Sequence, residues 1–382
     1  MNNTIRITAI SFLTYFVLSA MLAPIGIISG PMAEHFNQSV SDITRQFAWL
    51  TGGNLVGAVI ALFIFDYFGL KKLFAIIYGA IALALFSFRI VEDLDTTQYI
   101  LGIVGLGSGV GLAGAAVTIA RTYSEATRTS MLVITDGCFS IAGFVTSWTA
   151  AFLVARDMDW SLTYQLSGLF AASIFVLGIS SSFPAVEQDQ GTESTEPWPL
   201  AVWLCVASLF LYTLGQYSML FWLPNYAITQ LDAPEVQAGA LVGQFWLGMF
   251  LSQIFVAWWV MKIGVRRLVQ IAALTTLLFS IPLWLHRDID GLTILALIWG
   301  FANLSLLKAT LSLATELVSV PTARLVSLLL LGATVGTAVS PVVTSQVVDW
   351  TSNHTVLMFG SGCYLVLAVL LSSALRMSSR QQ

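Results

Sequence analysis

The chain has 382 residues, of which 57% are apolar and only 9% are charged, whereas soluble domains carry charge on about a quarter of their residues. This composition excludes an ordinary soluble protein and predicts an all-α integral membrane protein. A spanning helix needs about 20 apolar residues, so twelve spans would use most of the chain and leave no sizeable catalytic domain. The 16 Lys and Arg residues are scattered singly, so we expect no nucleic-acid partner.

Twelve long apolar runs, each bounded by charged or turn residues, are predicted to be transmembrane helices. The first is too long for a signal-peptide core and follows only one basic residue, so we expect it to stay in the protein as its first helix. In chain order the runs cover about 8 to 30, 44 to 65, 71 to 90, 98 to 120, 131 to 155, 160 to 183, 198 to 222, 236 to 261, 267 to 285, 292 to 314, 325 to 347 and 355 to 375.

The basic residues between the runs predict the orientation, because cytoplasmic loops carry an excess of Lys and Arg. With an even number of spans both termini lie on one side. If that side is cytoplasmic, eleven basic residues lie there: Arg6, Lys71, Lys72, Arg121, Arg128, Lys262, Arg266, Arg267, Arg324, Arg376 and Arg380. The other side receives only four, Arg45, Arg89, Arg156 and Arg287. Both termini are therefore predicted to be cytoplasmic.

One segment differs from the rest in composition. Residues 184–199 read PAVEQDQGTESTEPWP, with four acids, three prolines and no base, which is typical of a linker. It predicts an amino-terminal six-helix bundle at 1–183, a cytoplasmic linker at 184–197 and a carboxy-terminal six-helix bundle at 198–382.

The two halves share short motifs, which predicts an internal repeat. DYFGLKK follows the second run and MKIGVRR follows the eighth, and their glycines, Gly69 and Gly264, are 195 residues apart. Gly143 and Gly336 lie 193 residues apart in the similar segments SIAGFVTS and ATVGTAVS. The positive-inside rule alone also explains such a loop, as a tight turn in which glycine permits a close approach.

The repeated loop, with Asp66 three residues before Gly69, resembles the signature loop of the major facilitator superfamily of transporters. Tyr67 and Leu70 stand where that family usually has Arg, and Met261 replaces the acid in the second copy. The segments YTLGQYSMLFWLPNY and FWLGMFLSQ look like the fucose:proton symporter branch. TDGCFSIAG, AAFLVAR and LGQYSMLFWLPNYA are similar to TsgA-type proteins, whose cargo is uncertain.

The resemblance implies two pseudo-symmetric six-helix bundles that move a small solute by alternating access, with helices 1, 4, 7 and 10 lining the cavity. It also implies a monomer in the bacterial inner (plasma) membrane, without a cofactor. Gly26 stands where the sugar symporters carry an acidic or amide residue, Gln216 where they often have Glu, and Gln253 where they often have Arg. Because each change removes a charge, we expect a neutral or weakly polar solute and leave ion coupling open.

Polar and aromatic residues of the seventh, eighth and tenth spans are the candidate solute contacts. Gln216 follows Tyr212 by four residues, so a helix places both on one face. Gln216 equally fits an interhelical hydrogen bond, and Trp222 fits an interfacial anchor. Ser305, Lys308, Ser312 and Thr315 recur at helical spacing as a polar stripe that should face protein or water. The predicted contacts are Tyr212, Gln216, Trp222, Tyr226, Trp246, Asn303 and Lys308.

Asp136 lies about five residues into the fifth span, where a carboxylate should be paired or protonated. In this family the loop between helices 8 and 9 lies close to helix 5, which implies Arg266 as its partner, with Lys262 nearby and Lys308 as the alternative. Asp136 could instead stabilise the first turn of helix 5 through the helix dipole. The predicted gating residues are Asp66, Gly69, Lys71, Asp136, Gly264 and Arg266.

Other motifs predict no catalytic chemistry. The G-x-G-x-x-G from Gly109 to Gly114 lies inside an apolar run, so we interpret Gly105 with Gly109 and Gly107 with Gly111 as close helix packing instead of a dinucleotide site. His35, His286 and His354 fall in separate predicted loops, so no metal site is expected. The sequence predicts a secondary transporter and no enzyme. The alternative is a transporter-like sensor or scaffold without transport activity.

Overall fold

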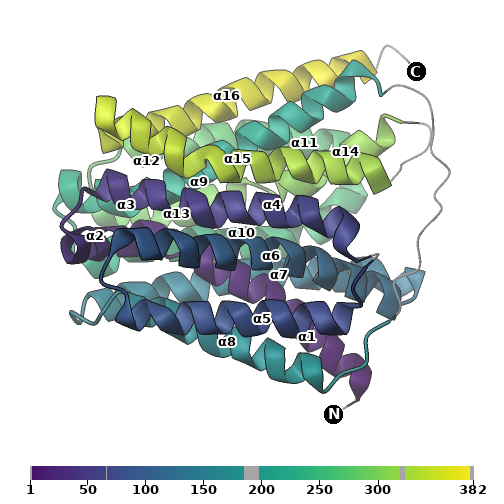
Figure 1. Ribbon diagram of the computed structural model, residues 1–382. Coiled ribbons are helices and arrows are strands. Elements are labelled where there is room, and N and C mark those ends of the chain that lie inside the picture. The colour runs from purple at the N-terminus through teal and green to yellow at the C-terminus, as the bar shows by residue number, and fades with distance from the viewer. Residues whose placement is uncertain (1, 66, 185–197, 319–322, 379–382) are drawn as a thin grey trace. The chain divides into compact units, whose positions relative to one another are not determined.

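The computed structural model describes residues 2–65, 67–184, 198–318 and 323–378, and within these ranges it contains helices and no strand. Contacts between Cα atoms divide the chain into two compact units, Met1–Gln188 and Asp189–Gln382. The first unit contains α1 (Asn3–Leu22), α2 (Ile25–Phe36), α3 (Val40–Gln46), α4 (Ala48–Ile64), α5 (Leu70–Ser87), η1 (Phe88–Ile90), α6 (Leu94–Thr122), α7 (Glu125–Val154) and α8 (Ser161–Ile179) (Figure 1). The second contains α9 (Leu200–Leu231), α10 (Glu235–Ile263), α11 (Val265–Ser280), α12 (Pro282–Leu285), α13 (Ile289–Ala302), α14 (Leu306–Glu316), α15 (Ala323–Trp350) and α16 (Asn353–Ser378).

Twelve helical segments of the described chain, 19 to 32 residues long, are long and apolar enough to cross a membrane. Each overlaps one of the twelve predicted spans, so the prediction of twelve spans is confirmed and the protein is a multi-pass membrane protein. Helices satisfy this role because lipid offers no hydrogen bonds, and a helix pairs its backbone groups internally. The seventh span continues past the predicted end at 222, through Pro224 to Leu231.

The first predicted span, 8 to 30, is two helices and not one. α1 ends at Leu22 and α2 begins at Ile25, with Pro24 between them. Proline has no N–H to donate, so carbonyls before it lose helical partners. The hydroxyl of Tyr164, on α8, donates to the carbonyl of Met21 at 3.2 Å. A side chain of a neighbouring helix therefore replaces part of the hydrogen bonding that the break removes.

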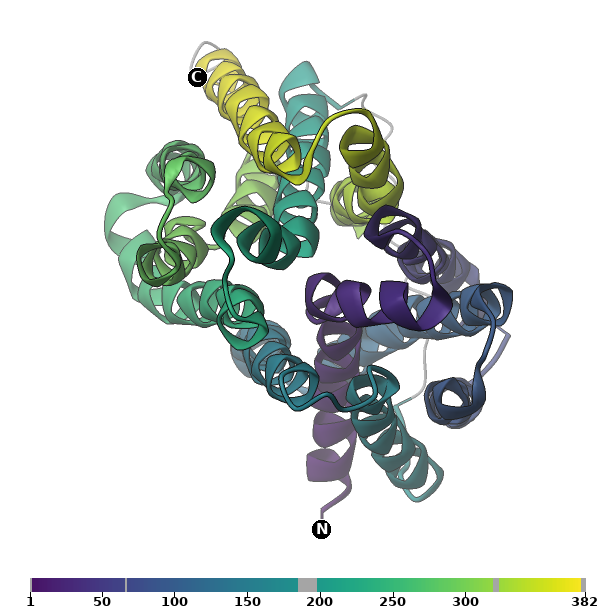
Figure 2. The ribbon, with the colours of Figure 1, turned by 90° about the vertical axis from the view of Figure 1, so that its left-hand side faces the viewer.

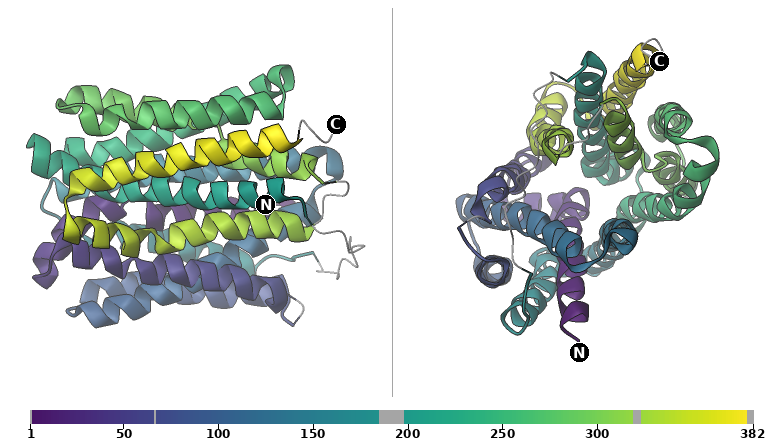
Figure 3. Two further views of the ribbon diagram at one scale, coloured as in Figure 1. Left: turned by 90° about the horizontal axis from the view of Figure 1, so that it is seen from above. Right: turned by 90° about the vertical axis from the view of Figure 1, so that its right-hand side faces the viewer.

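The helices of each unit run alongside one another (Figures 1 and 3), and Figure 2 shows them nearly end-on. The same pairs of spans pack together in both units. The second and fourth spans pack as α4 on α6, and their counterparts pack as α10 on α13. Likewise α1 packs on α7 as α9 packs on α15, and α5 on α8 as α11 on α16. This repeated packing agrees with the motif repeat in the sequence.

Glycines permit the close approach of the second and fourth spans. A Cβ added to Gly105 would overlap the carbonyl of Leu50 on α4, and one added to Gly109 would overlap the carbonyl of Asn54. The predicted helix packing is confirmed for these two glycines. Gly107 and Gly111 instead face side chains of α5, those of Ile77, Ile81 and Tyr78.

The counterpart pair in the second unit uses one glycine from each helix. An added Cβ on Gly248 of α10 would overlap the carbonyl of Leu297, and one on Gly300 of α13 would overlap the carbonyl of Phe245. The α10–α13 contact therefore depends on backbone lying against backbone, as the α4–α6 contact does.

The start of α1 is fastened to the end of α8. The Asn3 side chain donates to the carbonyl of Ser182 at 2.8 Å and accepts from the backbone N–H of Ser182 at 2.9 Å. Arg6 donates to the carbonyl of Ser180 at 3.0 Å. We call these three bonds the N-terminal clip. Phe183 then stacks on Phe74 of α5, with ring centroids 5.2 Å apart.

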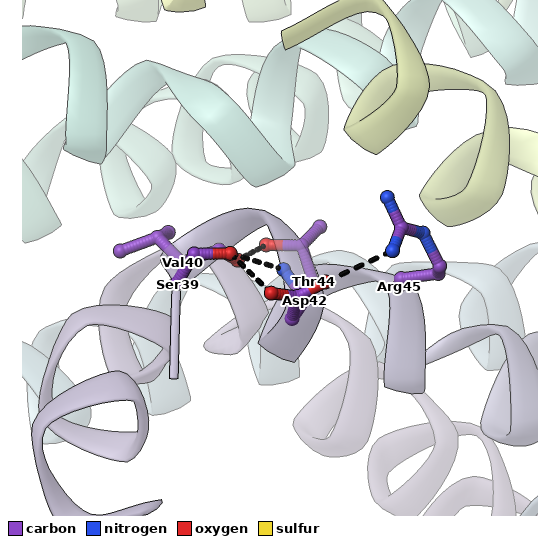
Figure 4. A network of polar contacts seen from close by, with 5 residues as sticks. All are labelled: Ser39, Val40, Asp42, Thr44 and Arg45. Atoms are coloured by element: carbon purple, nitrogen blue, oxygen red, sulfur yellow. Dashed lines mark hydrogen bonds and ion pairs between the residues drawn. The ribbon is translucent and has the colours of Figure 1, made fainter. Parts of the chain in front are cut away.

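Polar caps begin several helices where the chain turns between spans. At the start of α3 the Ser39 hydroxyl accepts from the N–H of Asp42 at 3.0 Å and donates to its carboxylate at 2.6 Å (Figure 4). Arg45 pairs with the same carboxylate at 2.9 Å. Asp93 caps α6 through the N–H of Thr96 at 2.6 Å, and the N–H and hydroxyl of Thr96 lower the Asp93 pKa. Such caps bind N–H groups that have no partner within the helix.

Candidate functional site

One face of α9 carries buried polar atoms that lack hydrogen bonds. Tyr212, Gln216, Trp222 and Tyr226 are between 0% and 3% exposed, and at 3.6 residues per turn they fall within an arc of about 120°. The two phenol oxygens, Gln216 Oε1 and Trp222 Nε1 have no hydrogen-bond partner among the described residues. A buried polar atom without a partner costs free energy. We call these four residues the α9 face.

Aromatic rings connect the α9 face to three other helices of the second unit. The ring centroids of Tyr212 and of Tyr364 on α16 are 6.5 Å apart, and those of Tyr364 and of Trp299 on α13 are also 6.5 Å apart. The ring centroids of Trp299 and of Phe245 on α10 are 4.3 Å apart, and those of Phe245 and Trp246 are 5.2 Å apart. The structure thus brings the predicted residues Tyr212 and Trp246 into one aromatic cluster. Tyr364 and Trp299 carry no sequence signal, because single aromatics in apolar runs look like ordinary packing residues.

The tenth span is broken, which corrects the prediction of a continuous polar stripe from Ser305 to Thr315. α13 ends at Ala302 and α14 starts at Leu306. Between them Leu304 and Ser305 are left-handed, with φ of 42° and 53°. Ser305 is the residue that precedes α14 and not a member of a helical stripe. Lys308, on α14, is exposed.

Asn303 lies at the break and is fully buried. Its Nδ2 donates to the carbonyl of Trp299 at 2.7 Å. This bond fixes the orientation of the amide, because only the nitrogen can donate. Its Oδ1 has no hydrogen-bond partner among the described residues. Asn303 therefore presents an acceptor next to the aromatic cluster.

The two repeated loops place their glycines in open space. Among the described residues other than the chain neighbours, no atom lies within 4 Å of a Cβ added to Gly69 or to Gly264, which does not fit the alternative explanation of a close approach at either glycine. Gly264 has φ of +76° and joins α10 to α11, whereas Gly69 has φ of −64° and directly precedes α5. Lys71 is exposed in the first turn of α5. The predicted gating residue Asp66 lies outside the described residues.

Arg266, in the first turn of α11, lies 3.8 Å from Glu316 at the end of α14, measured from Nε to Oε2. Sequence reasoning did not identify this partner, since the two residues are far apart in the chain. The ion pair is partly exposed, so its contribution to stability is small. Its geometric effect is to connect the α10–α11 turn to the end of α14, the second helix of the tenth span.

Asp136 lies well inside α7, which corrects its alternative role in the first helical turn. α7 begins at Glu125, preceded by Ser124, so Asp136 lies about three turns from the helix start. The dipole effect is confined to the first turn. Asp136 is half-buried. Its pairing with Arg266 stays a prediction.

All three histidines were predicted to lie in loops, and this is wrong for two of them. His35 is in the last turn of α2 and His354 in the first turn of α16, while His286 follows α12. His354 Nε2 lies 2.9 Å from the carbonyl of Trp284, so this nitrogen carries the proton. Within the described ranges no group of three or more His, Cys, Asp or Glu side chains could hold a metal ion.

Comparison with known proteins gives a consistent result. The sequence profile of the Major Facilitator Superfamily matches residues 7–243 and 206–381. The chain is 28% identical over 376 residues to the protein TsgA homolog of Yersinia pseudotuberculosis, covering 97% of this chain and 95% of the relative. A TsgA homolog of Yersinia pestis matches with the same identity and coverage.

Solved transporter structures share the fold. The POT family transporter PepTSo has a TM-score of 0.78 at 11% identity, covering 100% of this chain and 99% of that one. The nucleoside transporter NupG has a TM-score of 0.72 at 16% identity, covering 98% of this chain and 99% of that one. These findings indicate transport and not enzyme activity, and none supports a sensor or scaffold. The chain belongs to the Major Facilitator Superfamily and is a secondary transporter of a small solute.

Proposed function

We propose that the protein moves a small, uncharged, polar solute by alternating access, and that the α9 face contacts this solute. The supporting observation is the set of buried polar atoms at Tyr212, Gln216, Trp222 and Tyr226, for which no described residue supplies a hydrogen-bond partner. A solute that completes their hydrogen bonds removes the free-energy cost of leaving them unpaired. Asn303 Oδ1 and Trp246 extend the proposed site toward α13 and α10.

The chemistry of the α9 face supports an uncharged solute. An amide both donates and accepts, a phenol does the same, and an indole N–H donates. No ionised side chain belongs to this face, and an ion without an opposite charge is expensive to bury. Lys308 on α14 is the one predicted contact that carries charge, and it is exposed. The substrates in the names of NupG and PepTSo do not determine the solute here, because those chains share only the fold.

Alternating access requires two bodies that change position, which we assign to residues 1–183 and 198–382, joined by the linker 184–197. We propose that Asp136 pairs with Arg266 at the cytoplasmic side, with Lys308 as the alternative partner. Asp66, Gly69, Lys71 and Gly264 belong to the same gate. A pair formed in only one state biases the equilibrium by the difference in its strength between the states.

The basic residues support cytoplasmic termini in a bacterial inner membrane. We further propose that the protein acts as a monomer without a cofactor or nucleic-acid partner, as expected for a chain that belongs to this superfamily.

A ligand screen tests the proposed site. Purified protein is heated with a panel of neutral, anionic and cationic metabolites, because a ligand present at 100 times its Kd stabilises the folded state by about 2.7 kcal/mol. We expect neutral polar solutes to raise Tm in the parent protein and to lose this effect in Gln216→Leu. Gln165→Leu is the matched control, since among the described residues the Gln165 side chain bonds only Ser161 on its own helix, at 2.8 Å.

Two outcomes contradict the proposal. Stabilisation by charged metabolites alone would exclude an uncharged solute. Equal stabilisation of Gln216→Leu and the parent by the same ligand would remove Gln216 from the site and leave it as a packing residue.

A further inference from the structure

The break in the tenth span has no local cause in the sequence. No proline occurs between Ile289 and Glu316, and neither left-handed residue, Leu304 or Ser305, is a glycine. Left-handed backbone is unfavourable for such residues and persists only where surrounding contacts impose it. The cause must therefore lie in contacts with neighbouring helices.

Hydroxyl groups of α11 bond the carbonyl that the break leaves open. Thr275 Oγ1 donates to the carbonyl of Ala302 at 2.7 Å, and Thr276 Oγ1 lies 3.4 Å from the same oxygen. In a continuous helix this carbonyl would accept the N–H of Leu306, four residues on. Here that N–H donates to the carbonyl of Asn303 instead, at 2.8 Å. The threonine hydroxyls thus replace the missing helical bond.

Thr275 also has an acceptor ready within its own helix. Its oxygen lies 2.9 Å from the carbonyl of Ile271 and 3.2 Å from that of Ala272. A hydroxyl has one proton and donates fully to one acceptor at a time. When the Leu306 N–H returns to Ala302, Thr275 can turn to Ile271 without leaving a buried hydroxyl unsatisfied. Both arrangements of the tenth span are therefore compatible with the same Thr275.

We infer that Thr275 is a positioning residue whose hydroxyl keeps the tenth span broken, so that Asn303 Oδ1 faces the transported solute. The second half of this inference rests on the proposed function. Closing the break would return Leu304 and Ser305 to helical backbone and redirect the chain that follows Asn303. The Nδ2 bond would persist, because the Trp299 carbonyl has two lone pairs, but the surroundings of Oδ1 would change. Thr275 thus controls how Asn303 is presented without itself contacting the solute.

A distance measurement across the break tests the hydroxyl directly. Spin labels are placed at Ile294→Cys on α13 and Ser312→Cys on α14, after replacement of Cys138, Cys205 and Cys363. Thr275→Val preserves the shape of the side chain and removes the hydroxyl. We expect it to raise the ratio of a second distance population to the first by roughly two- to tenfold, as loss of one hydrogen bond implies. Thr275→Ser should restore the parent distribution.

Thr293→Val is the matched control, because within the described part of the chain the Thr293 hydroxyl donates only to the Ile289 carbonyl on its own helix, at 2.9 Å. It should leave the distribution unchanged and show that a valine in this region permits folding. A parent-like distribution in Thr275→Val would overturn the positioning role, whatever the solute proves to be.

A second measurement tests the presentation of residue 303. The rate at which N-ethylmaleimide labels Asn303→Cys should change by the same factor in Thr275→Val and return in Thr275→Ser. If the distances shift and this rate does not, Thr275 positions the helix but Asn303 is not presented to the solute pathway. Neither measurement uses the solute, so a failed ligand screen is distinguishable from failure of this inference.

Discussion

At the scale of single residues, only one of the two repeated loops requires glycine. Gly264 combines φ of 76° with ψ of 160°, a region that essentially only glycine occupies. Gly69, with φ of −64° and ψ of 144°, has a conformation open to any residue. The two copies of the motif therefore differ in backbone conformation at the shared glycine, which the sequence alone does not reveal.

We predict that Gly264→Ala destabilises the protein by about 1–3 kcal/mol, the cost of holding alanine in that region. Gly69→Ala should be neutral, because both positions have free space for a Cβ and only one has a positive φ. Thermal unfolding of the purified variants in detergent measures the difference. Equal unfolding temperatures for the two variants would show that the φ of Gly264 adjusts at no cost.

Residue spacing predicted part of the candidate site. The four-residue interval from Tyr212 to Gln216 placed both on one helix face, and the structure agrees. Tyr364 and Trp299 were missed because their role depends on contacts between helices distant in sequence. The alternative for Asp136 failed because α7 begins with the polar segment after Ser124, which an apolar run starting near 131 leaves out.

At the scale of helices, close glycine contacts join the second and fourth spans of each unit. Without a hydrophobic driving force between helices in lipid, packing depends on how closely backbones approach. In the second unit Gly248 and Gly300 leave no room for a methyl group against the carbonyls of Leu297 and Phe245. The fit is therefore sensitive to a single added carbon.

We predict that Gly248→Ala and Gly300→Ala each destabilise the protein by about 1–3 kcal/mol through overpacking. Gly362→Ala on α16 is the control, because no described residue outside its own helical turn comes within 4 Å of its added Cβ. Alanine is the better helix former by about 1 kcal/mol, so the control should be neutral or slightly stabilised. Chemical unfolding of the three variants measures this, and a stabilised Gly248→Ala would refute the tight contact.

The two broken spans differ in how far the sequence reveals them. Pro24 is a visible signal at the first break, although the apolar run continues across it. The break at Asn303 to Ser305 has no such signal, because threonines of another helix bond the carbonyl of Ala302. Hydropathy records which segments enter lipid and says nothing of the hydrogen bonds within them.

At the scale of the whole molecule, twelve spans could be predicted because only long apolar segments enter the bilayer. The division at 184–197 stays a prediction, since nearly all of that segment lies outside the described residues. The proposed charge pair of Asp136 with Arg266 would act between the two halves. Arg266 already has an acidic partner, Glu316, at 3.8 Å. A test of the proposed pair must therefore separate the effect of Glu316 from that of Asp136.

We predict that Asp136→Arg shifts the protein toward its inward-open state and that adding Arg266→Asp restores the balance, since the swap rebuilds an opposite-charge pair. The measurement is the rate at which maleimide labels a cysteine introduced at Ser312 on α14. The double variant is also compared in a Glu316→Gln background, because Arg266→Asp would otherwise face Glu316 as a like charge. If Arg266→Asp does not rescue Asp136→Arg in that background, and Lys308→Asp does not rescue it either, the proposed charge pair is wrong.

The N-terminal clip fixes the order in which the first unit can be completed during synthesis. Asn3 and Ser182 are 179 residues apart, so the ribosome must make the first six spans before the clip has both partners. At roughly 5–20 residues per second this takes about ten to forty seconds. The start of α1 thus gains these three bonds only after α8 has been made, whereas its packing on α6 and α7 can form earlier.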